Sequence, residues 1–292
     1  MADAGSASVG TIPVQHLRTG DHAFVSYADD DAGRDVVSAF AWAGLVKREK
    51  VMVFAAPHME AEQVWNRLDA PGALLGAARK HGQLVLSSMR ALIQPQDAFT
   101  PGRQWERITE ETDKALAEGY SGLRTYIDMH WVGDLGADVD VMMHRESNAQ
   151  HLFTDRPYTE ICAYDSRWFD PDVMTAMHKA HPCRLLPHLG ALHVEHSYGM
   201  VQLVGEADIA TREQFIGAVR EGLRRGEHSQ LLTVDLSGLV FLGVACAVDL
   251  LRLVLEHARG PVRVDCPPTS ARILRGAGAA QVPHLVINEV CH

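Results

Sequence analysis

The sequence lacks long apolar runs, blocks of basic residues and paired cysteine motifs. Without a run of about 18 apolar residues, no segment is expected to span a membrane. No basic segment precedes an apolar core at the N-terminus, as it would in a secretory signal. The net charge of −10 opposes contact with phosphate backbones. We therefore expect a cytoplasmic protein with no membrane partner and no direct nucleic-acid partner.

Cysteine and lysine are also scarce. The five cysteines include no C-x-x-C pair, and their odd number predicts free thiols. All five lysines lie at or before Lys179, so the composition changes along the chain. Pro182–Gly190, with two prolines and a closing glycine, is the predicted linker. We place the boundary near Leu186, which gives a flexible tail over residues 1–10 and domains over residues 11–186 and 187–292.

What is present in residues 11–186 is an alternation of short apolar strands and helices. Strands are predicted at residues 22–27, 51–55, 84–87, 123–129 and 161–164, and helices at residues 33–47, 58–68 and 105–118. Such an alternation predicts an α/β fold with a doubly wound, mostly parallel sheet.

Ligands of such folds bind beyond the carboxyl ends of the strands. The candidate ligand-binding residues at these ends are Tyr27, Asp29, His58, Asp128, His130, Trp131 and Asp165. Two of them have equally ordinary interpretations: Asp29 can belong to a solvated helix start, and Trp131 can either stack on a planar ligand or cover the core.

Motifs of catalysis are missing. A RecA-type ATPase needs G-x-x-x-x-G-K-[ST] after its first strand, and this chain has YADDDAGRD there, whose aspartates repel phosphate. No G-x-S-x-G elbow occurs, and Cys162 within an apolar strand is interpreted as a small buried hydrophobe. We predict no enzymatic activity and no catalytic residues.

Several segments carry a resemblance to a known family. They read GDHAFVSYADDDAGRDVVSAFAWAGLVKREKVMVFAAP, GYSGLRTYIDMHW, HRESNAQ and ICAYDSRWFDPDVMTAMHKAHP. Together they resemble the MEDS domain over His16–Pro182. The resemblance implies a RecA-like fold without its phosphate loop, in a domain that senses while another domain supplies output. Glu146, which we place at the start of a helix, matches a family position and is a further ligand-binding candidate.

The C-terminal region has its own pattern. Leu231–Glu256 reads as an apolar strand, a break at Ser237–Gly238 and a helix, and upstream a strand at Met200–Val204 precedes a possible capping box of Thr211 and Gln214. Residues 192–290 resemble a STAS domain, the fold of anti-sigma factor antagonists and sulfate transporter tails.

The STAS resemblance implies a partner and a missing switch. In that family the turn before the helix reads Asp-Ser-Ser-Gly, and a partner kinase phosphorylates one serine. The matching positions here, Gly243 to Cys246, carry no hydroxyl; Ser229 and Ser237 lie nearby. The implied partner is an anti-sigma factor or its kinase. The candidate docking residues, which can equally face the core, are Phe241, Leu242, Gly243, Val244 and Ala245.

Histidines and a cysteine cluster around the linker, between His178 and His196. His178 and His181 are three apart on a predicted helix, a spacing that suits a metal pair completed by Cys183 or His188. His181 can instead simply end that helix before Pro182. The cofactor, if any, is not identified.

The leading hypothesis is a non-enzymatic signalling regulator, with a sensory domain coupled to an anti-sigma factor antagonist-like domain in stress or developmental control. The alternatives are a metal- or haem-dependent sensor that uses the histidine cluster, and a nucleotide binder without hydrolysis. Homo-oligomerisation is compatible with each of them.

Overall fold

The computed structural model describes residues 10–68, 73–94, 98–226 and 231–290. Two compact units divide the chain: unit 1 contains Gly10 and residues 14–188, and unit 2 contains Thr11–Pro13 and residues 189–290. Residues 1–9 of the predicted tail and Ser229 lie outside the described residues. Part of the predicted linker is a strand, because Cys183–Leu185 pairs in parallel with the strand at His22–Tyr27.

Unit 1 is built on a mostly parallel sheet. In the order β1-β7-β2-β6-β5-β3-β4, every pairing from β7 to β4 is parallel. Its central strands are buried along almost their whole length, as expected where helices cover both faces. The predicted α/β class is confirmed. The strands are β1 (Gly10–Ile12), β2 (His22–Tyr27), β3 (Lys50–Phe54), β4 (Leu84–Ser87), β5 (Leu123–Asp128), β6 (Tyr158–Asp165) and β7 (Cys183–Leu185).

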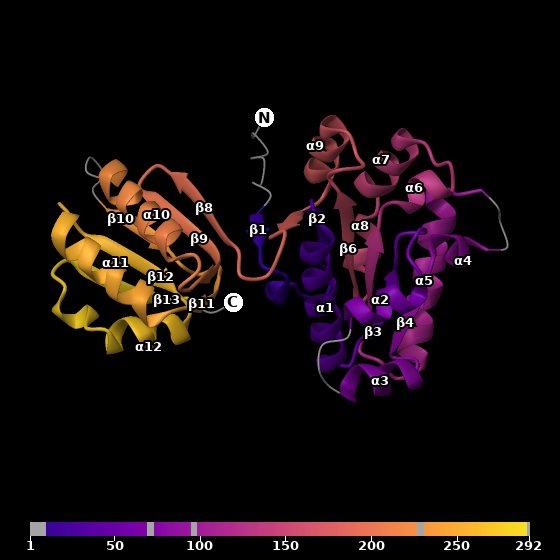
Figure 1. Ribbon diagram of the computed structural model, residues 1–292, viewed down its shortest axis with the longest axis horizontal. Helices are drawn as coiled ribbons and strands as arrows, with labels where there is room; N and C mark the ends of the chain where they lie inside the picture. Colours follow the sequence, from indigo (N-terminus) through magenta and orange to yellow (C-terminus); the bar gives the residue numbers. More distant parts are fainter. Residues whose placement is uncertain (1–9, 69–72, 95–97, 227–230, 291–292) are drawn as a thin grey trace. The chain divides into compact units, whose positions relative to one another are not determined.

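Helices lie on both sides of this sheet, with α1 and α5 on opposite sides (Figure 1). Helix α5 begins four residues before its predicted start, because Thr100 caps it by accepting a hydrogen bond from the Arg103 amide, and Pro101 opens it. The helices are α1 (Asp30–Val46), α2 (Ala61–Leu68), α3 (Ala73–Lys80), α4 (Met89–Ile93), α5 (Pro101–Ala117), α6 (Trp131–Asp134), α7 (Val139–Ser147), α8 (Gln150–Thr154) and α9 (Pro171–Ala180), preceded by the 3₁₀ turn η1 (Val14–His16).

Unit 2 has a mixed sheet in the order β11-β9-β10-β12-β13, and β8 joins it as the antiparallel partner of β9. The pairings along the rest of that order are parallel. The strands are β8 (Leu192–Ser197), β9 (Met200–Ala207), β10 (Leu232–Asp235), β11 (Leu239–Leu242), β12 (Val262–Cys266) and β13 (Leu285–Glu289). The helices are α10 (Arg212–Arg225), α11 (Val244–His257), α12 (Pro268–Gly276) and the 3₁₀ turn η3 (Ala279–Gln281).

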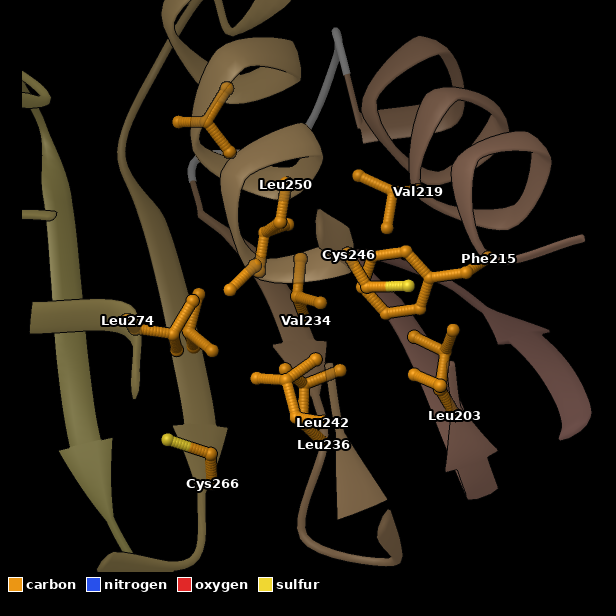
Figure 2. Close-up of a cluster of buried hydrophobic side chains, with 14 of the residues drawn as sticks. Leu203, Phe215, Val219, Val234, Leu236, Leu242, Cys246, Leu250, Cys266 and Leu274 are labelled. Carbon is orange, nitrogen blue, oxygen red and sulfur yellow. The ribbon is translucent and has the colours of Figure 1, made fainter. Parts of the chain in front are cut away.

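The core of unit 2 lies between one face of the sheet and its helices. Figure 2 shows Phe215, Val219 and Leu250 from α10 and α11 over Leu203 and Val234 of the strands, and all five side chains are fully buried. Neighbouring strand positions alternate with polar side chains on the opposite face. That alternation is typical of a sheet that packs helices on one face only.

Two local predictions in unit 2 are wrong. Leu239–Leu242 is strand β11, whereas a helix was predicted to follow the break at Ser237–Gly238. The Thr211 hydroxyl donates to the Glu206 carbonyl, and the Gln214 amide donates to the Leu192 carbonyl, so the expected capping box does not form. Both side chains tie α10 to the strands instead. In the described parts of both units, no helix combines the length and apolarity that a membrane crossing requires.

Candidate functional site

The carboxyl ends of three neighbouring strands bring together the predicted ligand-binding residues. Tyr27 ends β2, Asp128 ends β5 and Asp165 ends β6, which lies between them in the sheet. The Tyr27 hydroxyl donates a 2.7 Å hydrogen bond to Asp128 Oδ2. These residues were predicted to lie at the carboxyl ends of the strands, and the strand order brings those ends side by side, with Tyr27 in contact with Asp128.

His130 connects the two carboxylates of this group, which we call the rim site (Tyr27, Asp128, His130, Asp165 and Arg167). Asp128 Oδ1 accepts from the His130 amide at 3.1 Å and from its Nδ1 at 2.6 Å. Nε2 then faces Asp165 Oδ2 at 3.8 Å. Arg167 holds Asp165 through Nε at 2.9 Å and Nη2 at 2.7 Å. The imidazole therefore stands between a carboxylate that fixes its orientation and one that is already paired.

The electrostatics of the rim site favour a charged imidazole. Burial opposes protonation of His130, but the hydrogen bond and charge of Asp128 outweigh it and raise its pKa. Burial also works against ionised Asp165, yet its hydrogen bonds with Arg167 lower the pKa of that carboxyl. Burial, followed by the charge of Asp128, raises the pKa of Tyr27, so its phenol stays protonated. His130 is therefore the group of the rim site whose protonated form its neighbours favour.

A pocket opens beside the rim site. Its walls are mostly apolar, and two phenols, a carboxylate and a guanidinium contribute its polar groups. Gly33 allows α1 to start close to Tyr27, since a Cβ there would lie 3.3 Å from the ring. The lining includes Tyr27, Arg34, Val37, Val53, Val64 and Asp128. The cavity measures about 30 Å³, which holds one or two water molecules. It therefore admits only a very small molecule, and a larger ligand would have to displace the side chains that line it.

Other predicted ligand-binding residues have different places. The His58 ring reaches the rim site, with its centroid 5.1 Å from that of His130. Asp29 is exposed before α1. Trp131 is 2% exposed and packs in the core with its ring 4.4 Å from Phe99, so it covers the core rather than stacking on a ligand.

Sequence reasoning missed Arg167 and Trp168 at the rim site. The Trp168 ring centroid lies 4.8 Å from that of His130, and 54% of the residue is exposed. The available signal was their position, because both follow within three residues of Asp165, which ends β6.

A second polar group is sealed inside unit 1. Glu146 lies near the end of α7, not at a helix start as predicted, and it is 2% exposed. Around it are His22 from the start of β2, Cys162 from β6 and His181, the residue that follows α9. Each of the four offers a ligand atom, and these atoms all lie within 4.8 Å of one another. We call these four residues the buried cluster.

Arg145 and Glu160 adjoin the buried cluster. Arg145 Nη1 and Nη2 contact the two Glu160 oxygens at 2.5 and 2.7 Å, and Nη1 lies 2.9 Å from Glu146 Oε2. Burial acts to raise the pKa values of both glutamates, but the charge of Arg145 more than offsets it and lowers them. Both carboxylates are therefore ionised in a site that water does not reach.

The metal ligands predicted around the linker lie in different surroundings. Of the predicted ligands only His181 belongs to the buried cluster: α9 ends at Ala180, and His181 is extended, so it leaves the helical face of His178. The Cys183 thiol donates to the His22 carbonyl at 3.4 Å, and His188 is exposed. Nitrogen, oxygen and sulfur donors of the buried cluster are those that zinc-type ions prefer.

The predicted partner surface lies where β11 meets α11. Phe241 is 50% exposed and Val244 is 65% exposed, while Ala245 also faces solvent and Gly243 is half-buried. One turn along α11, Val248 adds a side chain that is 47% exposed. Leu242 is 2% exposed and packs in the core, so it does not belong to this surface.

Comparison with solved structures finds a flagellar accessory protein, FlaH, from Methanocaldococcus jannaschii. The identity is 10% and the TM-score 0.40, and the match covers 65% of this chain and 80% of that one. No curated protein matches the sequence. A family model described as MEDS, the MEthanogen/methylotroph, DcmR Sensory domain, matches residues 21–182, more than half of the chain. Both the rim site and the buried cluster fall within that range. The chain therefore belongs to the MEDS sensory domain family.

Proposed function

We propose that the chain is a non-enzymatic signalling protein, in which unit 1 senses a small molecule and unit 2 binds an anti-sigma factor or its kinase. One observation carries the output half of this proposal: Phe241, Val244 and Val248 expose apolar side chains together at the β11–α11 junction. Isolated exposed apolar residues are ordinary, but neighbouring ones that include an aromatic ring are typical of binding surfaces.

The position of this surface supports a STAS-like role. It coincides with the turn at which the STAS resemblance puts the phosphoacceptor, and residues Gly243 to Cys246 carry no hydroxyl there. Cys246 is fully buried and its thiol donates to the Asp208 carbonyl at 3.4 Å. Partner binding at this junction would therefore proceed without phosphorylation of the turn, and unit 1 would supply the regulation.

The sensory half rests on the pocket beside the rim site. Its apolar walls and its volume of about 30 Å³ would admit a very small, largely uncharged ligand, or a larger one that displaces the lining side chains. Tyr27 and Asp128 would orient the ligand's polar group. A ligand changes output only if it binds one arrangement of the protein more tightly than another. We propose binding without chemical conversion, because the Asp128 carboxylate is already engaged by Tyr27 and His130.

The test is binding of the full chain to purified anti-sigma factors and their kinases from the same organism. Phe241→Asp is expected to weaken binding at least about tenfold, since a central aromatic residue commonly contributes more than 1.4 kcal/mol. Val286→Asp is the matched control, because Val286 is 58% exposed but lies on β13. Equal loss in both variants, or no binding by the unmodified chain to any of these partners, would contradict the proposal.

A further inference from the structure

His181 has a buried nitrogen that the protein alone leaves unsatisfied. Its Nδ1 lies 2.7 Å from the Met177 carbonyl oxygen, and since a carbonyl only accepts, Nδ1 carries the hydrogen. In the neutral ring Nε2 is then a bare lone pair. It is fully buried without a hydrogen-bond partner and lies 3.3 Å from Glu146 Oε2, which is also an acceptor.

Two facing acceptors in a site closed to bulk solvent are stabilised by a cation between them. Leaving a buried acceptor unpaired costs free energy, and setting it against an ionised carboxylate adds repulsion. A positive species that accepts both electron pairs removes both penalties.

Four of the six donor separations fit tetrahedral coordination, and the other two, from His181 Nε2 to His22 Nε2 and to Cys162 Sγ, lie within 4.8 Å. Zinc–ligand bonds of about 2.0 to 2.3 Å correspond to ligand–ligand separations of roughly 3.3 to 3.8 Å. His22 Nε2 lies 3.1 Å from Glu146 Oε2 and 3.5 Å from Cys162 Sγ, and that sulfur lies 3.6 Å from the same carboxylate oxygen. Together with the 3.3 Å separation from His181 Nε2, four edges of the tetrahedron lie at or within about 0.2 Å of this range.

We propose that His22, Glu146, Cys162 and His181 form a binding site for a zinc-type divalent cation. The ligand atoms would be both Nε2 atoms, one Glu146 oxygen and the Cys162 sulfur. On binding, the Cys162 thiol loses its proton to solvent and the metal–sulfur bond forms, so no oxidant or reductant is involved. The two-histidine, one-thiolate, one-carboxylate donor set favours zinc over magnesium or calcium, which prefer oxygen donors alone.

Charge balance in the surroundings supports the cation. With Cys162 as thiolate, the site and its neighbour Glu160 carry three negative charges, which the Arg145 guanidinium and a dication neutralise while both imidazoles stay uncharged. The groups that orient the ligand side chains are present too. The Met177 carbonyl orients His181, and Arg145 holds Glu146.

Four protein ligands leave no open coordination position, so the ion would be structural and not catalytic. It would join the start of β2, the middle of β6, the end of α7 and the residue after α9. Because every ligand is at most 3% exposed, loading is expected during folding and not by exchange into the folded chain.

The experiment measures metal in untagged protein purified without chelator, and then refolds metal-free protein with Co²⁺. We expect about one zinc-type ion per chain and, after refolding, the near-ultraviolet absorption of a thiolate–cobalt bond. Cys162→Ser should abolish that absorption, and His181→Gln should reduce metal content severalfold. Cys183→Ser and His178→Gln, changes at neighbouring residues outside the buried cluster, should leave both unchanged.

The competing state is a protonated His22 that donates to Glu146 in place of the metal. It predicts unmodified protein that is free of metal as purified and that refolds with Co²⁺ to native tryptophan fluorescence without thiolate absorption. That pair of results would overturn the proposal, and neither depends on a variant that folds. Metal retained by Cys162→Ser but lost from Cys183→Ser would also overturn the assignment.

Discussion

Arg145→Met removes the guanidinium that pairs with two sealed carboxylates while keeping much of the side-chain volume. Arg145 is 1% exposed, and the side chains of Glu146 and Glu160 are fully buried. Its three contacts with these carboxylates span 2.5 to 2.9 Å. The variant would leave both negative charges inside unit 1 without that partner.

The expected cost is about 3 to 5 kcal/mol, the loss typical when one member of a buried ion pair is removed. Folded proteins are stable by only about 5 to 15 kcal/mol in total, so this loss is a large fraction of the free energy of unfolding. Arg156→Met is the matched control: Arg156 pairs with Asp113 at the surface, where the residues' side chains are 33% and 55% exposed. Such a pair contributes at most about 1 kcal/mol.

The pH dependence has a definite sign. The charge of Arg145 holds the pKa of Glu160 below its ordinary value. The ionised Glu160 therefore stabilises the folded protein fully above the unfolded pKa of about 4.3, and this stabilisation is lost as pH falls toward the folded pKa. In Arg145→Met the guanidinium charge no longer opposes the effect of burial, which raises the pKa of both carboxyls. Both can therefore protonate as pH falls. The difference in stability between unmodified and variant protein should therefore shrink between pH 7 and pH ~4.5.

Urea unfolding followed by tryptophan fluorescence is the assay. All five tryptophans lie at or before Trp168, so the signal reports unit 1 alone. A loss for Arg145→Met no larger than that for Arg156→Met, or one that is equal at both pH values, would refute the assignment of Arg145 as the cation that neutralises these carboxylates.

Two further predictions concern backbone packing and the rim site. Gly122→Ala would place a Cβ 2.4 Å from the Pro157 carbonyl oxygen, and its free energy of unfolding in urea should fall by about 1 to 3 kcal/mol. Gly102→Ala, in open space on α5, should instead raise the free energy of unfolding by about 0.5 to 1 kcal/mol. A change of the same sign in both variants would contradict the packing argument. The raised pKa of His130 means that its stabilisation is complete below pH ~6.5 and is lost as pH rises through the folded pKa. Histidine NMR should give a midpoint above 6.5 that falls in Asp128→Asn, and an unchanged midpoint would show that Asp128 does not set it.

The sequence predicted the strands of unit 1 better than its helices. His22–Tyr27 and Leu84–Ser87 match the observed strands residue for residue, because each is a short run bounded by turn-forming or charged residues. Helices α3, α4, α6 and α7 were missed, since most are too short to show a 3.6-residue period. The helix predicted to carry His178 and end at His181 is α9, which ends at Ala180. Thr100 and Pro101 indicate the true start of α5, whereas the prediction from the apolar pattern begins at Trp105, the first large apolar residue of the helix.

The rim site was predictable and the buried cluster was not. Strand ends of a parallel sheet share one edge, so the topology alone groups Tyr27, Asp128 and Asp165. The buried cluster draws on residues from four separate elements, and which side chains turn inward depends on packing that one sequence does not reveal. One signal was present: Glu160 and Cys162, two apart, occupy the same face of a strand that is otherwise apolar.

Strand β6 carries both polar groups, and their different access to water separates their roles. Cys162 enters the buried cluster from within the strand, whereas Asp165 joins the rim site at its end, where Trp168 and His58 are exposed. A sensing group has to meet its ligand, so the pocket side of β6 suits recognition. A group without water access suits a fixed anchor, since any unpaired charge there is costly. The ion pairs around the buried cluster therefore hold in register the strand from which the rim site extends.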